Sequence, residues 1–433
     1  MNIKGIDIAK YLGENFNHLY RSDAGIIEFI AGSLPENISY LQILNEIITQ
    51  PKPLFIDFNG IPLPLFYYES ADHKITLADL TVKDLSINSF LLLSGWQEVV
   101  IKKRDLHERF PYSESLQSKF NFAGIPVVNF LFNEMCLRIK QSGYHCNPLK
   151  FSTAGSNIIF THDIDRLYSG WYEATGHVIK NPWTGKLRSW VELSRRKLFF
   201  QVDDYQDACY RLLALLDKFQ IKSVFFFLAS RSRDDADYRL GDHFTVRFIK
   251  DLQEAGHIPG LHAGYHTFRD PGQLNRQIGQ ACNFLGENII NNRQHFLKFD
   301  LSFTPLTLFN AGIKYDFSLG FAEAPGFRNS IATPFYVFDF LHPESARLVE
   351  VPLFFMDGTY SHYQRIDKHG FRNPLEDIAQ YSKYFNMNFS VLFHNSVFTD
   401  FKYQGFSQLF IDVAEFAAEQ GFSADAHIRW PEM

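Results

Sequence analysis

Ile158-Ile-Phe-Thr-His-Asp-Ile-Asp165 is a short β-branched and aromatic run that ends in two carboxylates separated by one residue. A run of this length after Gly155-Ser-Asn157 predicts a buried strand. Asp163 and Asp165 then lie where the strand leaves the sheet. In α/β folds this edge is where ligands bind. We therefore expect the chain to be arranged around these two carboxylates, as half of a divalent-metal site.

The composition is that of a globular protein with large cores. At 433 residues the chain is too long for one ordinary domain, so two are expected. A hydrophobic share of 46% with 21% charged residues fits a globular class, and the 45 Phe are expected to fill core positions. The net charge of −6 argues against a nucleic-acid partner, which would require a basic face.

Cysteine usage and the N-terminal sequence predict a cytoplasmic protein. The four cysteines show no C-x-x-C pair, which favours free thiols in a reducing compartment. Residues 1–10 carry charges every few positions and lack the apolar region of a secretion signal. No stretch approaches the roughly 18 uninterrupted apolar residues of a membrane helix, so we expect no integral membrane segment.

The first 145 residues are expected to form a smaller α+β domain of unknown role. Apolar spacing predicts helices at 38–48, 88–100 and 126–139, and strands at 53–60 and 61–68. We see no metal-ligand cluster and no nucleophile–base arrangement in this part of the sequence. Gly, Pro and Ser between residues 141 and 156 predict a boundary, so that residues 150–433 form the second domain.

From residue 157 onward, strand and helix patterns alternate. After the first strand, strands are expected at 222–228, 257–262, 295–299, 315–319, 349–355 and 389–393. Helices are expected at 203–219, 244–255, 271–285, 305–311, 374–385 and 407–420, with Asp203 or Asp204 as the N-cap of the first. Alternation indicates parallel strands with helical crossovers. Because polar residues recur at strand ends, we expect a distorted seven-stranded (β/α) barrel.

Histidines follow two of the expected strands. His262 ends the strand 257–262 and is followed by His266, and His394 ends the strand 389–393. Each has a structural interpretation on its own, as a hydrogen-bonded core histidine or a loop residue. The ends of parallel strands share one face, however, so these side chains are expected to meet Asp163 and Asp165 there.

Two histidines and one carboxylate match a catalytic zinc-type site with an open position for water. A second carboxylate beside that water can act as general base, and a histidine from another strand as general acid. Such a site hydrolyses a carbonyl compound, because the metal lowers the pKa of the bound water and polarises the carbonyl oxygen.

These residues carry a resemblance to a known family. Thr161-His-Asp-Ile-Asp165, His262-x-x-x-His266 and Val391-Leu-Phe-His394 resemble the T-F-D-D, H-[ST]-x-x-H and L-x-x-H motifs of the polysaccharide deacetylases (carbohydrate esterase family four, the NodB-homology domain). The resemblance covers residues 150 to the end well. More loosely, the N-terminal part, with Phe90–Glu98 and Asp105–Pro111, is similar to a domain that precedes a bacterial branch of the family.

The resemblance implies roles for individual residues. Asp163 would be the catalytic base, His394 the acid that protonates the departing amine, and Asp165, His262 and His266 the ligands of a divalent metal, first of all Zn²⁺. The protein would be a hydrolase of non-peptide carbon–nitrogen bonds that removes acetyl from an N-acetylated glycan. Without an export signal, a lipid-linked or nucleotide-linked glycan precursor is the expected substrate.

The sequence also departs from the family pattern. Ile164 separates the two aspartates, which leaves open which of them binds the metal, and Ala263 replaces the Ser or Thr of the second motif. The R-x-P-Y motif is absent; Arg293 takes its place as a catalytic residue that orients Asp163 or stabilises an oxyanion, with a structural salt bridge as the alternative. His295 shares a strand face with Arg293 and is an alternative metal ligand.

Two other functions remain open. Asp163-Ile-Asp165 also matches the D-x-D motif of nucleotide-sugar glycosyltransferases, but that interpretation leaves the three histidines without a role. The altered second and third motifs are compatible with a catalytically impaired glycan-binding protein on the same fold. Stoichiometric zinc binding together with acetate release would exclude this alternative.

Overall fold

Strand β5 (Asn157–Ile164) is buried along its whole length in the computed structural model. It pairs in parallel with β6 (Ser223–Leu228) on one side and with β13 (Asn388–Leu392) on the other. The structure describes residues 3–36, 39–69, 75–149, 155–183, 186–286, 288–342, 348–364 and 373–427. A strand covered on both faces favours apolar side chains, which explains the run Ile158-Ile-Phe160.

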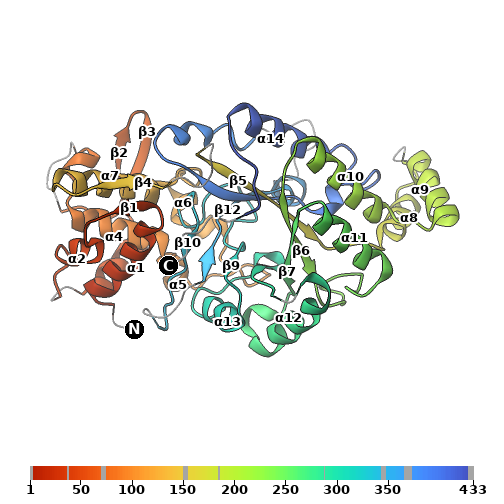
Figure 1. Ribbon diagram of the computed structural model, residues 1–433, viewed down its shortest axis with the longest axis horizontal. Coiled ribbons are helices and arrows are strands. Elements are labelled where there is room, and N and C mark those ends of the chain that lie inside the picture. The colour runs from red at the N-terminus through yellow and green to blue at the C-terminus, as the bar shows by residue number, and fades with distance from the viewer. Residues whose placement is uncertain are drawn as a thin grey trace.

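Among the described residues, the sheet around β5 has nine strands in the order β10-β11-β9-β8-β7-β6-β5-β13-β12. The remaining strands are β7 (Ile258–Ala263), β8 (Asn291–Gln294), β9 (Tyr315–Asp316), β10 (Phe335–Tyr336), β11 (Val349–Glu350) and β12 (Leu353–Met356). All neighbours are parallel except β10 and β11. The sheet curls into a half-barrel with helices outside it (Figure 1), and within the described residues no ladder joins β10 to β12.

The expected α/β class is confirmed, but the count of seven strands is wrong. The run expected at 349–355 is divided at Pro352 into β11 and β12, because proline cannot donate a ladder hydrogen bond. Strand β10 is an addition of two residues, too short for a sequence pattern to reveal. The expected distorted barrel is a half-barrel in the structure, in which β12 has only β13 as a neighbour among the described residues.

The fourth strand lies four residues earlier than expected. Strand β8 consists of Asn-Asn-Arg-Gln, and all four residues are buried. The expected strand at 295–299 is instead a 3-10 turn, His295–Leu297, in which Phe296 and Leu297 have φ of 59° and 56°. His295 therefore follows a strand end, as Asp165 and His394 do.

The helices of this half mostly match their expected positions. They are α10 (Asp204–Lys218), α11 (His243–Glu254), α12 (Pro271–Leu285), α13 (Thr304–Asn310) and α14 (Ser407–Glu419). Asp203 caps α10 by accepting from the backbone N–H of Tyr205 at 3.2 Å. The helix expected at 374–385 is only a 3-10 turn, Ala379–Lys383, and helices α8 (Gly170–Lys180) and α9 (Leu187–Phe200) were not expected. None of the described helices is both long and apolar enough to cross a membrane.

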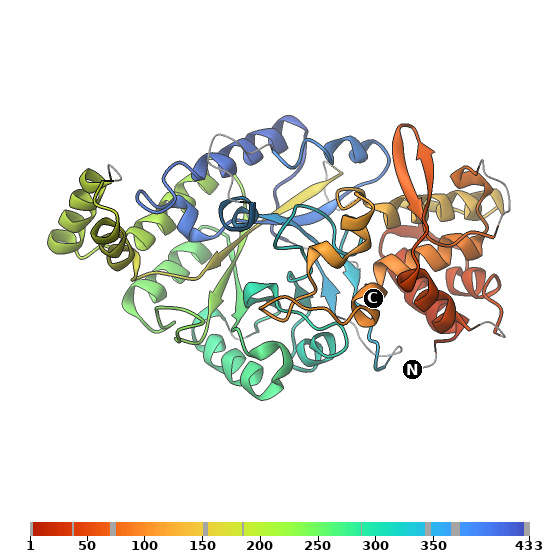
Figure 2. The same cartoon turned by 180° about the vertical axis from the view of Figure 1, so that it is seen from behind.

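The N-terminal part packs against one end of the half-barrel (Figure 2). Its elements are α1 (Gly5–Asn17), β1 (Tyr20–Ser22), α2 (Ile26–Ala31), α3 (Tyr40–Thr49), β2 (Leu54–Phe58), β3 (Ile61–Leu65), α4 (Val82–Leu93), α5 (Trp96–Val100), α6 (Leu116–Lys119), α7 (Val127–Gln141) and β4 (Cys146–Pro148). The helix expected at 88–100 is interrupted by Gly95, whose φ of 69° ends α4. One hydrophobic cluster runs from Ile3 to Phe422, so the two parts share a core; the boundary near residues 145–150 stays a prediction.

A buried ion pair joins the two parts. The guanidinium of Arg328 donates to both carboxylate oxygens of Glu98 on α5, at 2.6 and 2.5 Å, and the two side chains are only 2% and 4% exposed. Two parallel hydrogen bonds to a carboxylate give the strong, directional form of this interaction. The pair therefore fixes α5 against the sheet half.

Glu98→Ala is expected to lower the free energy of unfolding by about 3–5 kcal/mol, because it removes the carboxylate that neutralises the buried Arg328 cation. Urea denaturation followed by circular dichroism measures this loss. Lys103→Ala is the control, since the Lys103–Glu114 pair has a lysine that is 65% exposed, and its removal should cost at most about 1 kcal/mol. Equal losses in the two variants would show that the buried pair is not what joins the two parts.

Two buried carboxyls face each other in neighbouring strands. Asp316 of β9 and Glu350 of β11 are in register and fully buried, and Glu350 accepts from the backbone N–H of Leu319 at 2.7 Å. Burial raises the pKa of Glu350 well above its usual value, and the charge of Asp316 raises it further. A raised folded-state pKa favours the protonated form in the fold. The stability that Glu350 contributes is thus complete below its unfolded pKa of about 4.3 and is lost as the pH rises through the folded value.

Glu350→Gln is expected to stabilise the protein increasingly as the pH rises. The free energy of unfolding of the variant should equal that of the wild type near pH 4. Above this pH it should exceed the wild-type value by up to about 1.4 kcal/mol for each pH unit, until Glu350 ionises in the fold. Urea unfolding between pH 4 and pH 8 measures this difference. Glu254→Gln is the control, because the Glu254 side chain is 65% exposed. The difference in free energy of unfolding between this variant and the wild type should not change with pH. A difference in free energy of unfolding that does not change with pH for Glu350→Gln as well would contradict the raised pKa of Glu350.

Candidate functional site

The carboxyl ends of the central strands open into one cavity of about 410 Å³. Asp163 and Asp165 reach it from the end of β5, and His262 from β7. His295 follows β8, and His394 follows β13. The cavity is thus lined by the polar residues expected at the strand ends, apart from Arg293 and His266.

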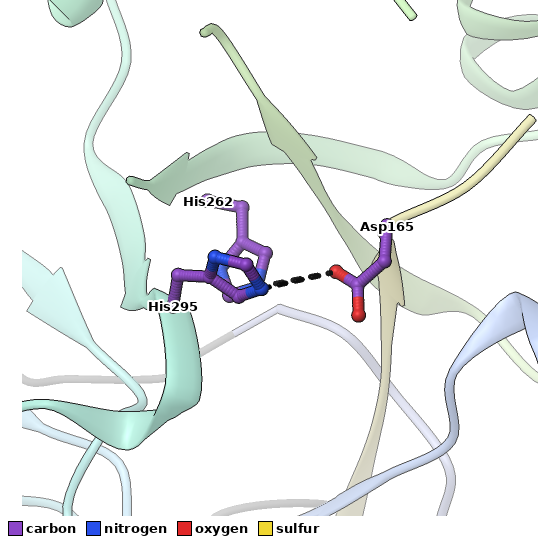
Figure 3. A group of neighbouring side chains, drawn as sticks. All are labelled: Asp165, His262 and His295. Carbon is purple, nitrogen blue, oxygen red and sulfur yellow. Dashed lines mark ion pairs between the residues drawn. The ribbon is translucent and has the colours of Figure 1, made fainter. Parts of the chain in front are cut away.

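Asp165, His262 and His295 form a cluster in which one ligand atom from each residue lies within 4.8 Å of the others (Figure 3). The Asp165 Oδ1 atom is 3.5 Å from His262 Nε2 and 4.0 Å from His295 Nε2. Ligand atoms about 2.0–2.1 Å from a tetrahedral ion would lie about 3.4 Å apart. The three residues are therefore spaced as a possible site for one divalent cation.

Hydrogen bonds on the far side of both rings leave their Nε2 atoms as acceptors. His262 Nδ1 lies 2.9 Å from the backbone carbonyl oxygen of Arg293, which can only accept, so Nδ1 carries the proton. His295 Nδ1 lies 3.1 Å from the Asp235 carboxylate. Burial raises the pKa of Asp235, but its hydrogen bonds with His295 and Ser230 outweigh burial and hold that pKa below its usual value. Both imidazoles thus turn a lone pair toward Asp165, with the outer partners typical of metal ligands.

The Asp165 carboxylate supplies the clearest indication of a cation. Its Oδ1 atom is buried and has no hydrogen-bond partner among the described residues, although it lies between two imidazole nitrogens. A buried anionic oxygen without a partner is costly. A cation between the three residues would remove this cost, so the donor set fits a metal ion.

The structure does not place His266 in this cluster. Its side chain is 59% exposed and lies 3.6 Å from Asp234. A spacing of four residues brings two side chains together on a helix, whereas His262 ends a strand and His266 precedes the 3-10 turn Thr267–Arg269. His295, the alternative ligand in the sequence, occupies the third position instead.

Asp163 is held by Arg293 across the inside of the half-barrel. Arg293 Nη1 donates to Asp163 Oδ1 at 2.9 Å, and the arginine is completely buried between the rings of Phe226 and Phe317. Burial raises the pKa of the Asp163 carboxyl, but Arg293 and the nearby histidines outweigh burial and lower that pKa. Arg293 is not among the described residues that line the cavity, and its side chain holds the Asp163 carboxylate in one orientation.

His394 is hydrogen-bonded to Asp357, a residue for which the sequence predicted no role. Its Nδ1 lies 2.6 Å from Asp357 Oδ1, and its backbone N–H donates to Asp357 Oδ2 at 2.7 Å. Burial lowers the pKa of His394, but the charge of Asp357 outweighs burial and raises that pKa to about 10. Asp357 follows β12 just as His394 follows β13, and this shared position at neighbouring strand ends was the available signal.

The N-terminal part contributes a residue to the cavity wall. Arg109 lies in the segment between α5 and the rest of this part, and it donates to the Phe296 carbonyl oxygen at 3.0 Å and to the Tyr363 hydroxyl at 2.9 Å. On the other side of the guanidinium, Arg109 Nε donates to Asp105 Oδ2 at 2.8 Å. No sequence pattern indicated this contact, because it joins segments almost 190 residues apart.

His295→Ala is expected to weaken zinc binding roughly 100-fold or more, because it removes one of three protein ligands. Competition with a chromogenic chelator measures the affinity of the purified protein. His266→Ala is the matched control and should change the affinity less than about twofold, since His266 lies outside the cluster. The reverse order of the two effects would restore His266 as the ligand.

A family of unknown function, DUF7033, matches residues 10–143. No curated protein matches the sequence. Among solved structures, the chain is similar to a putative polysaccharide deacetylase from Mycobacterium smegmatis, with 15% identity, a TM-score of 0.36, and 66% of this chain and 99% of that chain covered.

Two further solved structures are similar. The chitin deacetylase from Colletotrichum lindemuthianum is 12% identical with a TM-score of 0.33, over 66% of this chain and 94% of that chain. A CE4 family pseudoenzyme from Bacillus anthracis is 10% identical with a TM-score of 0.30, over 64% of this chain and 66% of that chain. At these scores the chemistry of the site has to be interpreted from its own residues.

Proposed function

We propose that the protein is a metal-dependent hydrolase that removes N-acetyl groups from an amino-sugar-containing glycan or glycan precursor. The observation that carries the proposal is the buried Asp165 Oδ1, which lies between the Nε2 atoms of His262 and His295 and has no hydrogen-bond partner in the part of the chain that the structure describes. The resemblance of the strand-end motifs to polysaccharide deacetylases supports the same reaction.

Zn²⁺ is the proposed ion, held by Asp165, His262 and His295. Two imidazoles and one carboxylate are the donor set of many catalytic zinc sites, which keep one position open. When bound, the ion would lower the pKa of a water molecule and polarise the acyl carbonyl group of the substrate.

Asp163 is the proposed general base. Its Oδ1 atom is engaged by Arg293, whereas its Oδ2 atom lies 3.4 Å from His262 Nε2 and thus faces the ligand cluster. A carboxylate that is kept ionised and held in one orientation can accept the proton of the attacking water at Oδ2. This gives the two aspartates separate roles.

His394 is the proposed general acid. Asp357 holds Nδ1, and Nε2 lies 3.9 Å from Asp165 Oδ2, on the cavity side. Breaking a carbon–nitrogen bond requires a proton on the departing nitrogen, and a protonated imidazole can donate it from Nε2. Overall, water adds a hydroxyl to the acyl carbon and a proton to the nitrogen, which yields acetate and the free amine.

Aromatic and polar side chains around these groups fit a sugar. Tyr205, Tyr363, Tyr403 and Phe296 line the cavity together with Arg109. Rings of this kind bury the apolar face of a pyranose. The glycosyltransferase alternative is weaker than the hydrolase proposal, because Asp163 is engaged by Arg293 and the histidines at the strand ends would have no role in it.

Asp163→Asn is expected to lower acetate release at least about 100-fold while zinc remains bound, because the variant loses the base and keeps all three ligands. The substrate is a set of N-acetylated chitooligosaccharides, and released acetate is measured with an enzyme-coupled assay. Asp234→Asn, on the exposed side of the molecule, is the matched control and should retain full activity.

The outcomes separate the remaining possibilities. Equal acetate release by wild type and Asp163→Asn would exclude the assigned base. No acetate from the zinc-loaded wild type, with oligosaccharide still bound, would support the glycan-binding alternative. Loss of activity in Asp234→Asn would indicate that the effect of Asp163→Asn is not specific to its place in the site.

A further inference from the structure

Helices α8 and α9 expose an unusual concentration of apolar side chains. Of the 21 large hydrophobic side chains that are exposed among the described residues, eight lie between Gly170 and Phe200. Trp183 is 95% exposed, and Phe199 is 76% exposed. We name this segment, residues 170–183 and 186–200, the helical hairpin.

The helical hairpin projects from the end of the molecule opposite the N-terminal part (Figures 1 and 2). Its inner face is buried against the body, where Ala174 and Leu193 pack against Phe401. The outer face of α9 carries Leu187, Val191 and Leu198, whose spacings of four and seven place them on one side of the helix. The exposed side chains are therefore an apolar face that the described chain does not cover.

The helical hairpin is basic in an acidic protein. Its described residues include six Lys or Arg and two Glu, a net charge of +4, whereas the whole chain has −6 and the remainder accordingly −10. Arg196 and Lys197 turn toward carboxylates of the body, among them Asp400 and Asp203. Lys180, Arg188 and Arg195 are exposed and form no ion pair with the described residues.

We propose that the helical hairpin docks onto a membrane surface rich in anionic phospholipid. A helix with exposed aromatic and aliphatic side chains beside basic ones lies in the headgroup region of a bilayer, where the anionic lipids attract the cations. Trp183 and Tyr172 suit this region, because their rings are amphipathic. The surface repels a second copy of itself, since both copies would carry +4.

The position of the helical hairpin relates this docking to the cavity. Glu173 of α8 lines the cavity, where it pairs with Lys402 at 2.7 Å and accepts from the Tyr205 hydroxyl at 2.9 Å. A docked hairpin would hold the cavity near the bilayer. One consequence rests on the proposed function: the substrate would belong to the lipid-linked glycans. Docking itself does not depend on the reaction.

The test is sedimentation of the full chain with vesicles. One set contains phosphatidylcholine alone, and the other contains phosphatidylcholine with about one third phosphatidylglycerol, both in 0.1 M salt. We expect at least about tenfold stronger binding to the anionic set. The double variant Arg188→Glu, Arg195→Glu should weaken that binding by about fivefold or more for each residue changed, and Trp183→Ser with Leu198→Ser should weaken it at least about fivefold.

Arg247→Glu with Lys250→Glu is the matched control, because these α11 side chains are 69% and 74% exposed and lie outside the helical hairpin. The control should bind as the wild type does. Absence of binding to the anionic vesicles, or equal loss in control and hairpin variants, would overturn the proposal. A dimer that the hairpin variants dissociate, without vesicle binding by the wild type, would assign the apolar face to a second copy and overturn it as well. Acetate release is measured separately, so failure of the proposed reaction is distinguishable from failure of docking.

Discussion

The buried contact between Arg293 and Asp163 is the interaction on which the site depends. Arg293 leaves β8, crosses the inside of the half-barrel between Phe226 and Phe317, and donates to Asp163 at the end of β5. Its backbone carbonyl oxygen also accepts from His262 Nδ1. One residue therefore orients the proposed base through its side chain and sets the protonation of a proposed metal ligand through its backbone. A displacement of β8 would disturb both, and His295 as well.

The residue inserted between the two aspartates has a simple geometric effect. Successive side chains of a strand point to opposite faces, so Asp163 and Asp165 share one face and Ile164 takes the other. Ile164 is completely buried, while both carboxylates reach the cavity. The insertion therefore keeps the pair together and separates their tasks: Asp163 contacts Arg293, and Asp165 faces the imidazoles. The sequence left this division open because it depends on partners from other strands.

Apolar runs made much of the fold predictable. Strands β5, β6 and β13 and helix α10 with its Asp203 cap follow from local patterns, and His262 and His394 follow from strand ends. Strand β8 was not predicted because its four buried residues are polar, and their side-chain hydrogen bonds reach segments distant in the sequence, such as that of Asn292 with Asp316. His295 was consequently placed inside a strand rather than after one. The His394–Asp357 pair and the Arg109 contact join distant segments, which no local pattern reveals.

The place of β5 in the sheet also affects how the chain can be synthesised. Its neighbour β13 begins at Asn388, 224 residues after β5 ends at Ile164. At about 5–20 residues per second, β5 would leave the ribosome on the order of 10–45 s before that partner exists. During this interval a strand that contains the apolar run Ile158-Ile-Phe160 has an unpaired edge, the kind of edge that templates aggregation. The strand that organises the mature site is thus also a segment of the nascent chain whose edge has to be protected until its partner is made.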